Sequence, residues 1–186
     1  MGKLFGHIDA GLQAFIEAQR VFFVATAPLE ATGHINLSPK GLDTFRVLGA
    51  NTVAYLDHVG SGAETIAHLR ENRRIVVMLC AFDGAPRIVR LHGNGEVLEP
   101  GSAEYDRLRP LFADSPPARA IILVTVNRIS DSCGFAVPLY TFQDERPQLL
   151  AWADRKGAAG LTQYQAEKNA TSIDGLPAVT WMPKEP

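Results

Sequence analysis

Cysteine is scarce in this chain of 186 residues, which holds only Cys80 and Cys133. Two cysteines without metal-type spacing give neither a disulfide framework nor a zinc site. Long hydrophobic runs are missing too: the longest unbroken one, residues 75–82, is far shorter than the ~20 residues of a membrane-spanning helix. We therefore expect a protein of the reducing cytoplasm that holds no metal and does not enter a membrane.

Charge of one sign is not in excess either, because 18 Lys and Arg residues stand against 20 Asp and Glu residues, for a net charge of −2. Surfaces that bind nucleic acid or anionic membranes usually carry a basic excess, so neither partner is expected. The sequence also lacks a P-loop and a G-x-G-x-x-G motif after a strand, which argues against ATP and dinucleotide binding. Apolar residues make up 46% of the chain, and residues 1–186 are expected to form a single domain.

What the sequence has is a series of short β-type segments. Runs rich in β-branched and aromatic residues, or alternating polar and apolar ones, predict strands at residues 21–27, 34–38, 44–47, 51–57, 74–82, 86–97, 120–126 and 135–142. The Gly93-Asn94-Gly95 step is interpreted as a bulge rather than a turn. Helices are predicted at residues 8–19, about 64–70, 102–112 and from 148 to a stop at Gly157. This pattern is typical of a mainly β protein, an antiparallel barrel or sandwich.

The sharpest local motif is the Gly-Ser-Gly-Ala-Glu segment at residues 60–64. Ser61 as the N-cap and Glu64 three residues later predict a capping box at the start of a helix. A helix start presents unpaired N–H groups and the positive end of the helix dipole. Gly60 and Gly62 allow an anion to approach, Ser61 and Thr65 add hydroxyl groups, and a phosphate fits there. On this motif alone a plain capped helix without a ligand is expected, and phosphate binding is the alternative.

Other polar residues give weaker patterns. Ser38-Pro39-Lys40-Gly41, at the end of a predicted strand, combines a hydroxyl group, a cation and a glycine that suit an anionic ligand. Glu64 and His68 are four residues apart on the predicted helix, but no third metal ligand is evident, and a solvated helix face is expected. Cys133 has no defined His or Asp partner and is interpreted as a small buried hydrophobic residue rather than a nucleophile.

The order of these motifs resembles the pyridoxamine 5'-phosphate oxidase-like, FMN-binding split-barrel family. The resemblance rests on the segments Phe23–Ala27, Ile35–Gly41, Tyr55–Asp57 and Gly60–Thr65 in that order, followed by Arg74–Phe82 and Arg87–Gly93. It covers roughly residues 8–177. Single motifs are common in unrelated proteins, whereas the ordered set is specific.

The resemblance implies a six-stranded antiparallel split β-barrel over about residues 20–143, with flanking helices and a helical C-terminal extension over about 147–186. It also implies a homodimer that binds FMN between its two subunits. The implied cofactor site consists of Asn36, Leu37, Ser38, Pro39 and Lys40 along the flavin ring and ribityl chain, of Asp57, and of Gly60, Ser61, Gly62 and Thr65 at the phosphate. No catalytic acid or base is assigned, because flavin hydride transfer does not require one.

Two departures from the family pattern limit what the resemblance implies about activity. Pyridoxamine-phosphate oxidases carry Ser-Arg-Lys at the phosphate loop, whereas here Ser61 is followed by Gly62 and Ala63. Their C-terminal Arg-x-His signature is also absent. We therefore expect an FMN-dependent oxidoreductase acting on a small molecule other than pyridoxamine phosphate. A non-catalytic flavin-binding sensor or storage protein, or a deazaflavin- or haem-binding relative using His58 or His92, remains an alternative.

Overall fold

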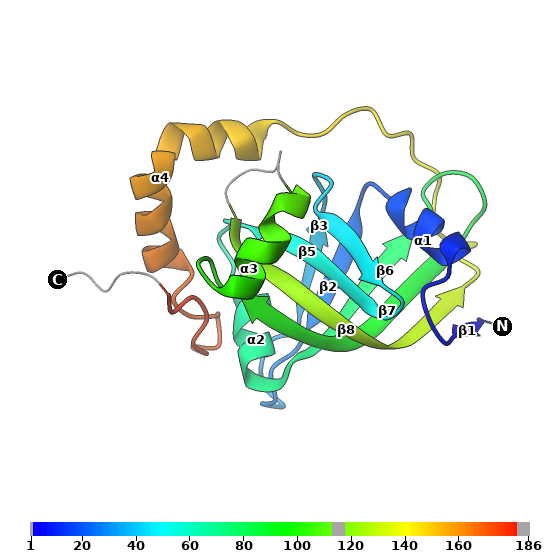
Figure 1. Cartoon of the computed structure of the whole chain (residues 1–186), viewed down its shortest axis with the longest axis horizontal. Coiled ribbons are helices and arrows are strands. Elements are labelled where there is room, and N and C mark those ends of the chain that lie inside the picture. The colour runs from blue at the N-terminus through cyan, green and yellow to red at the C-terminus, as the bar shows by residue number, and fades with distance from the viewer. Residues whose placement is uncertain (1, 113–117, 182–186) are drawn as a thin grey trace.

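The computed structural model describes residues 2–112 and 118–181, which form an antiparallel sheet of eight strands curled into an open barrel (Figure 1). The strands are β1 (Leu4–Phe5), β2 (Phe22–Thr26), β3 (Asn36–Lys40), β4 (Phe45–Gly49), β5 (Thr52–His58), β6 (Arg74–Cys80), β7 (Ile88–Leu98) and β8 (Ala118–Ser132). The helices are α1 (Ala10–Glu17), α2 (Glu64–Asn72), α3 (Ala103–Leu108), which continues into the 3-10 turn η1 (Arg109–Phe112), and α4 (Gln148–Lys168).

The sheet is split between its two edge strands. Its order is β3-β2-β6-β7-β8-β5-β4, with β1 attached to β8. The curvature brings the two ends of this order together, and Phe22 of β2 packs against Phe45 and Tyr55 with ring centroids 4.9 and 5.5 Å apart. The barrel therefore has a seam between β3 and β4. Side chains fill this seam, and the two strands are not joined across it by backbone hydrogen bonds.

Alternation along the strands decides which side chains face the barrel interior. On β2 the residues Phe22, Val24 and Thr26 are buried, and the residues between them are half-buried. The register pairs Lys40 with Phe22, Ser38 with Val24 and Asn36 with Thr26. Because paired residues share a face of the sheet, β3 turns its three polar side chains toward the inside and Leu37 and Pro39 toward the outside.

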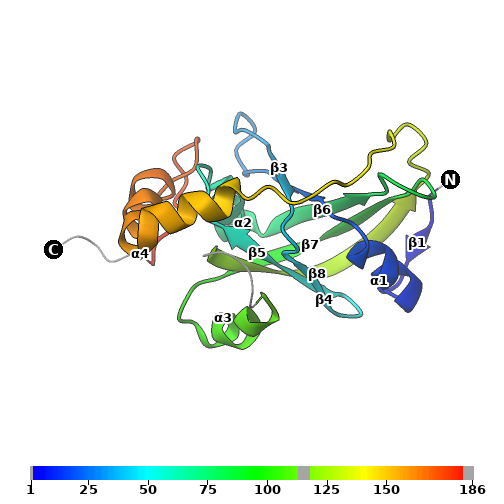
Figure 2. The same ribbon diagram turned by 90° about the horizontal axis from the view of Figure 1, so that it is seen from above.

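Two apolar clusters hold the barrel together, and a third, small one joins Val59 to Ala153 and Leu161 of α4. The larger one fills the barrel and includes Val24, Val77 and Leu91, with Ile66 and Leu69 of α2 closing one end. The smaller one lies on the outer face of β5 and β8, where α3 and η1 cover them; it consists of Ala54, Leu56, Leu98, Tyr105, Leu108, Phe112 and Ile121. On the other side of the sheet, no helix of the described residues covers the outer face of β3, β2 and β6 (Figures 1 and 2).

The predicted architecture is confirmed in its main features. The sheet is antiparallel and split, a register shift between His92 and Gly93 marks the expected bulge, and Asp9 and Ser102 cap α1 and α3. The strand count is wrong, since eight strands form rather than six. The segment at 120–126 is part of the 15-residue strand β8, which runs along β7 for most of its length.

The predicted strand at 135–142 is wrong as well. Residues 133–147, which we call the strap, contain no strand and run from the end of the molecule near the N-terminus across to α4 (Figure 2). Pro138 has no N–H to give to a strand neighbour, and Gly134 turns the chain with φ +66°. The predicted helix from 148 does break at Gly157, but α4 resumes and continues to Lys168. No helix in residues 2–112 and 118–181 is long and apolar enough to cross a lipid bilayer.

Candidate functional site

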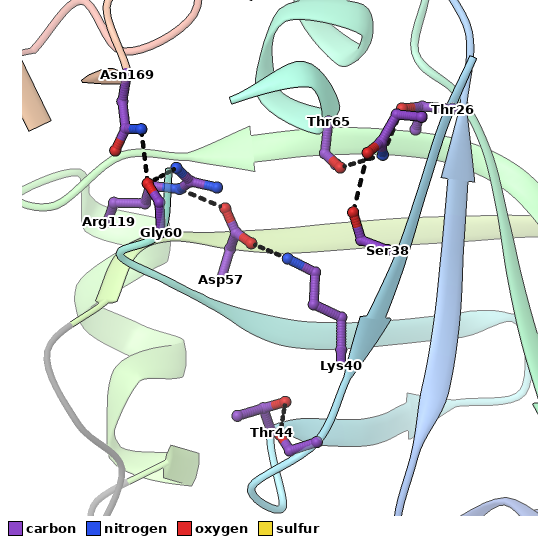
Figure 3. Close-up of polar contacts among 11 residues, drawn as sticks. Thr26, Ser38, Lys40, Thr44, Asp57, Gly60, Thr65, Arg119 and Asn169 are labelled. Carbon is purple, nitrogen blue, oxygen red and sulfur yellow. Dashed lines mark hydrogen bonds and ion pairs between the residues drawn. The ribbon is translucent and has the colours of Figure 1, made fainter. Parts of the chain in front are cut away.

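Polar side chains of β3 connect to the start of α2. The Asn36 Nδ2 group donates hydrogen bonds to the hydroxyl oxygens of Thr65 at 3.0 Å and of Thr26 at 3.3 Å. The Ser38 hydroxyl donates to Asn36 Oδ1 at 2.9 Å (Figure 3). Asn36 therefore ties the edge strand to the helix, and it uses both sides of its amide to do so.

A charged triad bridges the barrel seam next to these residues. Lys40 Nζ of β3 lies 2.8 Å from Asp57 Oδ1 of β5, and Arg119 Nε of β8 lies 2.8 Å from Asp57 Oδ2. Asp57 is fully buried and Arg119 is 3% exposed. Burial alone would raise the pKa of Asp57, but the charges of Arg119 and Lys40 hold that pKa well below its usual range. Two cations around one carboxylate leave a net charge of about +1 on the charged triad.

The Gly60–Ala63 segment, which we call the 60–63 loop, follows directly. The Gly60 carbonyl accepts hydrogen bonds from Asn169 Nδ2 at 2.8 Å and from Arg119 at 3.4 Å. Ser61 and Gly62 are exposed, whereas Ala63 is buried. The loop thus has one side fixed by Asn169 and Arg119 and an open side at Ser61 and Gly62.

The predicted capping box is wrong. The helix begins at Glu64 with Ala63 as its N-cap, and no side chain caps it. The Glu64 carboxylate instead accepts a hydrogen bond from the Ile173 N–H at 3.3 Å, because the C-terminal segment lies beside the start of α2. A Cβ at Gly62 would lie 2.4 Å from Glu64 Oε2, so a side chain there would require the flexible Glu64 carboxylate to shift. The first-turn N–H groups of α2 are therefore left without the side-chain cap that was expected.

The structure brings most of the expected site residues together. Lys40 touches Asp57, Asp57 touches Arg119, and Arg119 reaches the 60–63 loop. Asn36 and Ser38 join this group through Thr65. Leu37 and Pro39 lie on the opposite face of β3 and are exposed, so their side chains point away from the other residues of the group.

Several residues of the site were not expected from the sequence. Arg119 and Asn169 hold Gly60, and Thr26 and His68 extend the polar group, with His68 Nδ1 at 3.0 Å from the Thr26 hydroxyl. His68 was expected on a solvated helix face, but its side chain is fully buried, and burial lowers its pKa. The sequence holds a usable clue for Arg119: it is a lone charge in an apolar strand, and a buried charge needs a partner such as Asp57.

A groove of about 1180 Å³ opens beside Lys40, between β3 and the strap. Its lining includes Arg20, Lys40, Phe82, Tyr140 and Phe142. The strap is held there by aromatic contacts: Tyr140 stacks on Phe82 at 5.6 Å, and the Arg20 guanidinium lies over the Phe142 ring at 5.2 Å. The groove is large enough for a small organic ligand.

The remaining candidate residues lie elsewhere. His92 lines a separate pocket of about 420 Å³ on the outer face of the sheet, and His58 is half-buried at the end of β5. The expectation that Cys133 is buried is wrong, since it is exposed at the start of the strap, where the chain has left the sheet. Within the described parts of the chain, no three His, Cys, Asp or Glu residues are grouped so as to hold a metal ion.

Comparison with known proteins gives a consistent result. The family model described as pyridoxamine 5'-phosphate oxidase matches residues 8–133. The pyridoxamine 5'-phosphate oxidase family protein ustO of Aspergillus flavus is 43% identical over 179 residues, which cover 87% of this chain and 71% of that protein.

Solved structures share the fold at low sequence identity. HupZ of Group A Streptococcus has a TM-score of 0.55 and 19% identity over 72% of this chain and 99% of the HupZ chain. A candidate pyridoxamine 5'-phosphate oxidase of Lactobacillus delbrueckii has a TM-score of 0.51 and 14% identity, over 68% of this chain and 98% of the other. At these identities the likeness concerns the fold alone.

Proposed function

Because the chain belongs to the pyridoxamine 5'-phosphate oxidase family, we propose that it binds FMN and acts as an FMN-dependent oxidoreductase on a small-molecule substrate. The observation that carries this proposal is the charged triad of Lys40, Asp57 and Arg119 directly beside the 60–63 loop. A cationic group next to an uncapped helix start is the combination that suits a phosphate.

The residues present fit a phosphate group without the Arg-Lys pair of the pyridoxamine-phosphate oxidases. Lys40 and Arg119 supply the positive charge, and the uncapped first turn of α2 supplies N–H groups. Ser61 and Thr65 add hydroxyl donors. Glu64 is the one unfavourable neighbour, and the hydrogen bond from the Ile173 N–H stabilises its carboxylate. We assign the phosphate to the open side of the 60–63 loop.

The role of the protein's own residues in this proposal is to bind and orient the flavin and the substrate. A bound flavin supplies two-electron redox chemistry, while the protein supplies its position and surroundings. Asp57 stays ionised because its pKa is lowered, and it thereby holds the Lys40 ammonium group at the seam. Asn36 and Ser38 present polar groups along the inner face of β3. The groove beneath the strap adjoins Lys40, and we assign the substrate to it.

The first test is the ligand that co-purifies with the protein, identified by its visible spectrum and mass. FMN would support the proposal, whereas a haem Soret band or a deazaflavin mass would contradict it. Turnover of NADH or NADPH with a quinone or dye then separates an oxidoreductase from a flavin-binding sensor or storage protein. Bound FMN without any turnover would contradict the enzymatic part of the proposal.

Replacement of both Ser61 and Thr65 by Ala tests the phosphate assignment. Two lost hydrogen bonds of about 1 kcal/mol each should weaken FMN binding roughly 30-fold. Riboflavin, which lacks the phosphate, should lose less affinity than FMN, and any loss it shows reports on the Asn36 hydrogen bond that Thr65 accepts. Fluorescence titration of both ligands measures this. Thr162→Ala on the exposed face of α4 serves as the control; unchanged FMN affinity in the double variant would remove both residues from the site.

We also propose that the protein is a cytoplasmic homodimer. Both cysteines are free thiols, as expected in a reducing compartment. Ile35 and Leu37 are 77% and 65% exposed on the outer side of β3, a sheet face that no helix covers. Exposed apolar residues on one continuous face are typical of a protein–protein contact, and a second copy of the chain is the partner that the family suggests.

Leu37→Asp should weaken the dimer. Burying a leucine side chain contributes about 1.5–3 kcal/mol, so a charge there should raise the dimer dissociation constant at least roughly tenfold. Sedimentation equilibrium on protein without ligand measures this constant. Leu29→Asp is the matched control, because Leu29 is 64% exposed in the connection between β2 and β3. Equal effects of the two variants would show that the β3 face is not the contact.

A further inference from the structure

The 60–63 loop is supported from behind by a residue far away in the sequence. Asn169 donates from Nδ2 to the Gly60 carbonyl at 2.8 Å, and its side chain is fully buried. It begins the segment 169–181, which we call the C-terminal arm, and this arm lies outside residues 8–133 matched by the family model. Figure 3 shows Asn169 and Arg119 reaching the same carbonyl from two directions.

Peptide geometry converts this contact into a constraint on Ser61. The peptide bonds of the described residues are all trans, and a trans peptide unit is planar with its C=O and N–H pointing in opposite directions. Because the Gly60 carbonyl points toward Asn169 and Arg119, the Ser61 N–H must point away from them. Ser61 is exposed, so its N–H group is directed to the open side of the 60–63 loop.

The C-terminal arm is also attached to α2 and to the connection between β2 and β3. The Ile173 N–H donates to Glu64 Oε1 at 3.3 Å. Asp174 accepts from the His34 backbone N–H at 2.8 Å and lies 2.7 Å from His34 Nδ1. The position of Asn169 is therefore fixed, because the residues that follow it are bound to α2 and to the connection between β2 and β3.

We propose that Asn169 is a positioning residue of the phosphate site. It fixes the Gly60–Ser61 peptide so that the Ser61 N–H faces a phosphate monoester, and it does not itself touch the ligand. This inference rests on the proposed binding of FMN and adds that the C-terminal arm completes the site. Asn169 should therefore increase the affinity for FMN but not for riboflavin, because the Gly60–Ser61 peptide that it orients contacts only the phosphate end of the ligand.

The test compares Asn169→Ala and Asn169→Asp with the parent protein. Asn169→Ala removes the donor, and Asn169→Asp keeps the shape but sets a carboxylate oxygen against the Gly60 carbonyl. Loss of an oriented N–H to a charged phosphate should weaken FMN binding roughly tenfold in both variants, and more in Asn169→Asp. Riboflavin affinity should change less than twofold. Asp174→Ala is the control on the same arm, since it removes the contacts to His34 and leaves Gly60 supported.

A second measurement needs no ligand. Amide hydrogen exchange at Ala67, whose N–H donates to the Ala63 carbonyl of the 60–63 loop at 3.1 Å, should be roughly tenfold faster in Asn169→Ala than in the parent protein, while exchange in β7 and β8 stays the same. Unchanged exchange and unchanged FMN affinity in both variants would overturn the inference. If the parent protein does not bind FMN, the proposed function fails, and the exchange measurement still decides whether Asn169 positions the loop.

Discussion

Asp57→Asn should lower the free energy of unfolding by about 3–5 kcal/mol, the usual cost of removing one partner from a buried ion pair. The reason is Arg119, whose side chain is 4% exposed and has Asp57 as its carboxylate partner. An asparagine keeps the shape of the side chain but leaves this charge uncompensated. Lys40 loses the same partner, but its side chain is 20% exposed and can turn to water.

Urea unfolding followed by circular dichroism measures the effect. Glu96→Gln is the control, because Glu96 and Arg73 form an ion pair of 3.0 Å in which both side chains are more than half exposed. An exposed pair contributes little, so this variant should lose only a small fraction of what Asp57→Asn loses. Similar losses of unfolding free energy in the two variants would show that the buried charged triad contributes no more to stability than an exposed ion pair.

Lys40→Met should weaken FMN binding by roughly 10–100-fold, the range expected for one charge-assisted contact of about 1.5–3 kcal/mol. The substitution removes one of the two cations beside the 60–63 loop and leaves Asp57 paired with Arg119. The fold should therefore survive, and the net charge of the charged triad should fall from about +1 to about zero. The loss should be much smaller for riboflavin, because riboflavin brings no anionic group.

Isothermal titration of the variant with both flavins separates the two effects. Lys156→Met is a suitable control, since Lys156 lies over the Trp152 and Tyr164 rings of α4. Equal losses for FMN and riboflavin would place Lys40 along the flavin ring and not at the phosphate. No loss for either ligand would remove Lys40 from the site.

The sequence was most informative where a local pattern decides a local structure. Alternation of polar and apolar residues predicted the strands of the barrel, and the predicted helices at 8–19 and 102–112 correspond to α1 and to α3 with η1. The bulge at Gly93 was also foreseeable, because the strand pattern continues after it. The strand predicted at 135–142 was wrong because the prediction relied on the aromatic and apolar residues of that segment. Pro138 lacks the N–H that a strand position needs, and this should have counted for more.

The site was less predictable because its contacts join distant parts of the chain. Asn36 and Thr65 meet only because β3 and α2 lie side by side in the fold. The capping box failed for a similar reason: the C-terminal arm supplies a donor to Glu64 that no local pattern shows. His68 looked solvent-exposed on a helix of mixed polarity, but α2 closes the end of the barrel and buries it.

The contact between Asn169 and Gly60 spans 109 positions, which has a consequence for how the protein matures. During synthesis the barrel strands emerge from the ribosome well before residue 169 does. A nascent chain can pair its strands and bury its core, yet the Gly60 carbonyl still lacks the amide that comes with α4 and the residues beyond it. The proposed FMN site is therefore completed late, after the barrel and the C-terminal arm have met.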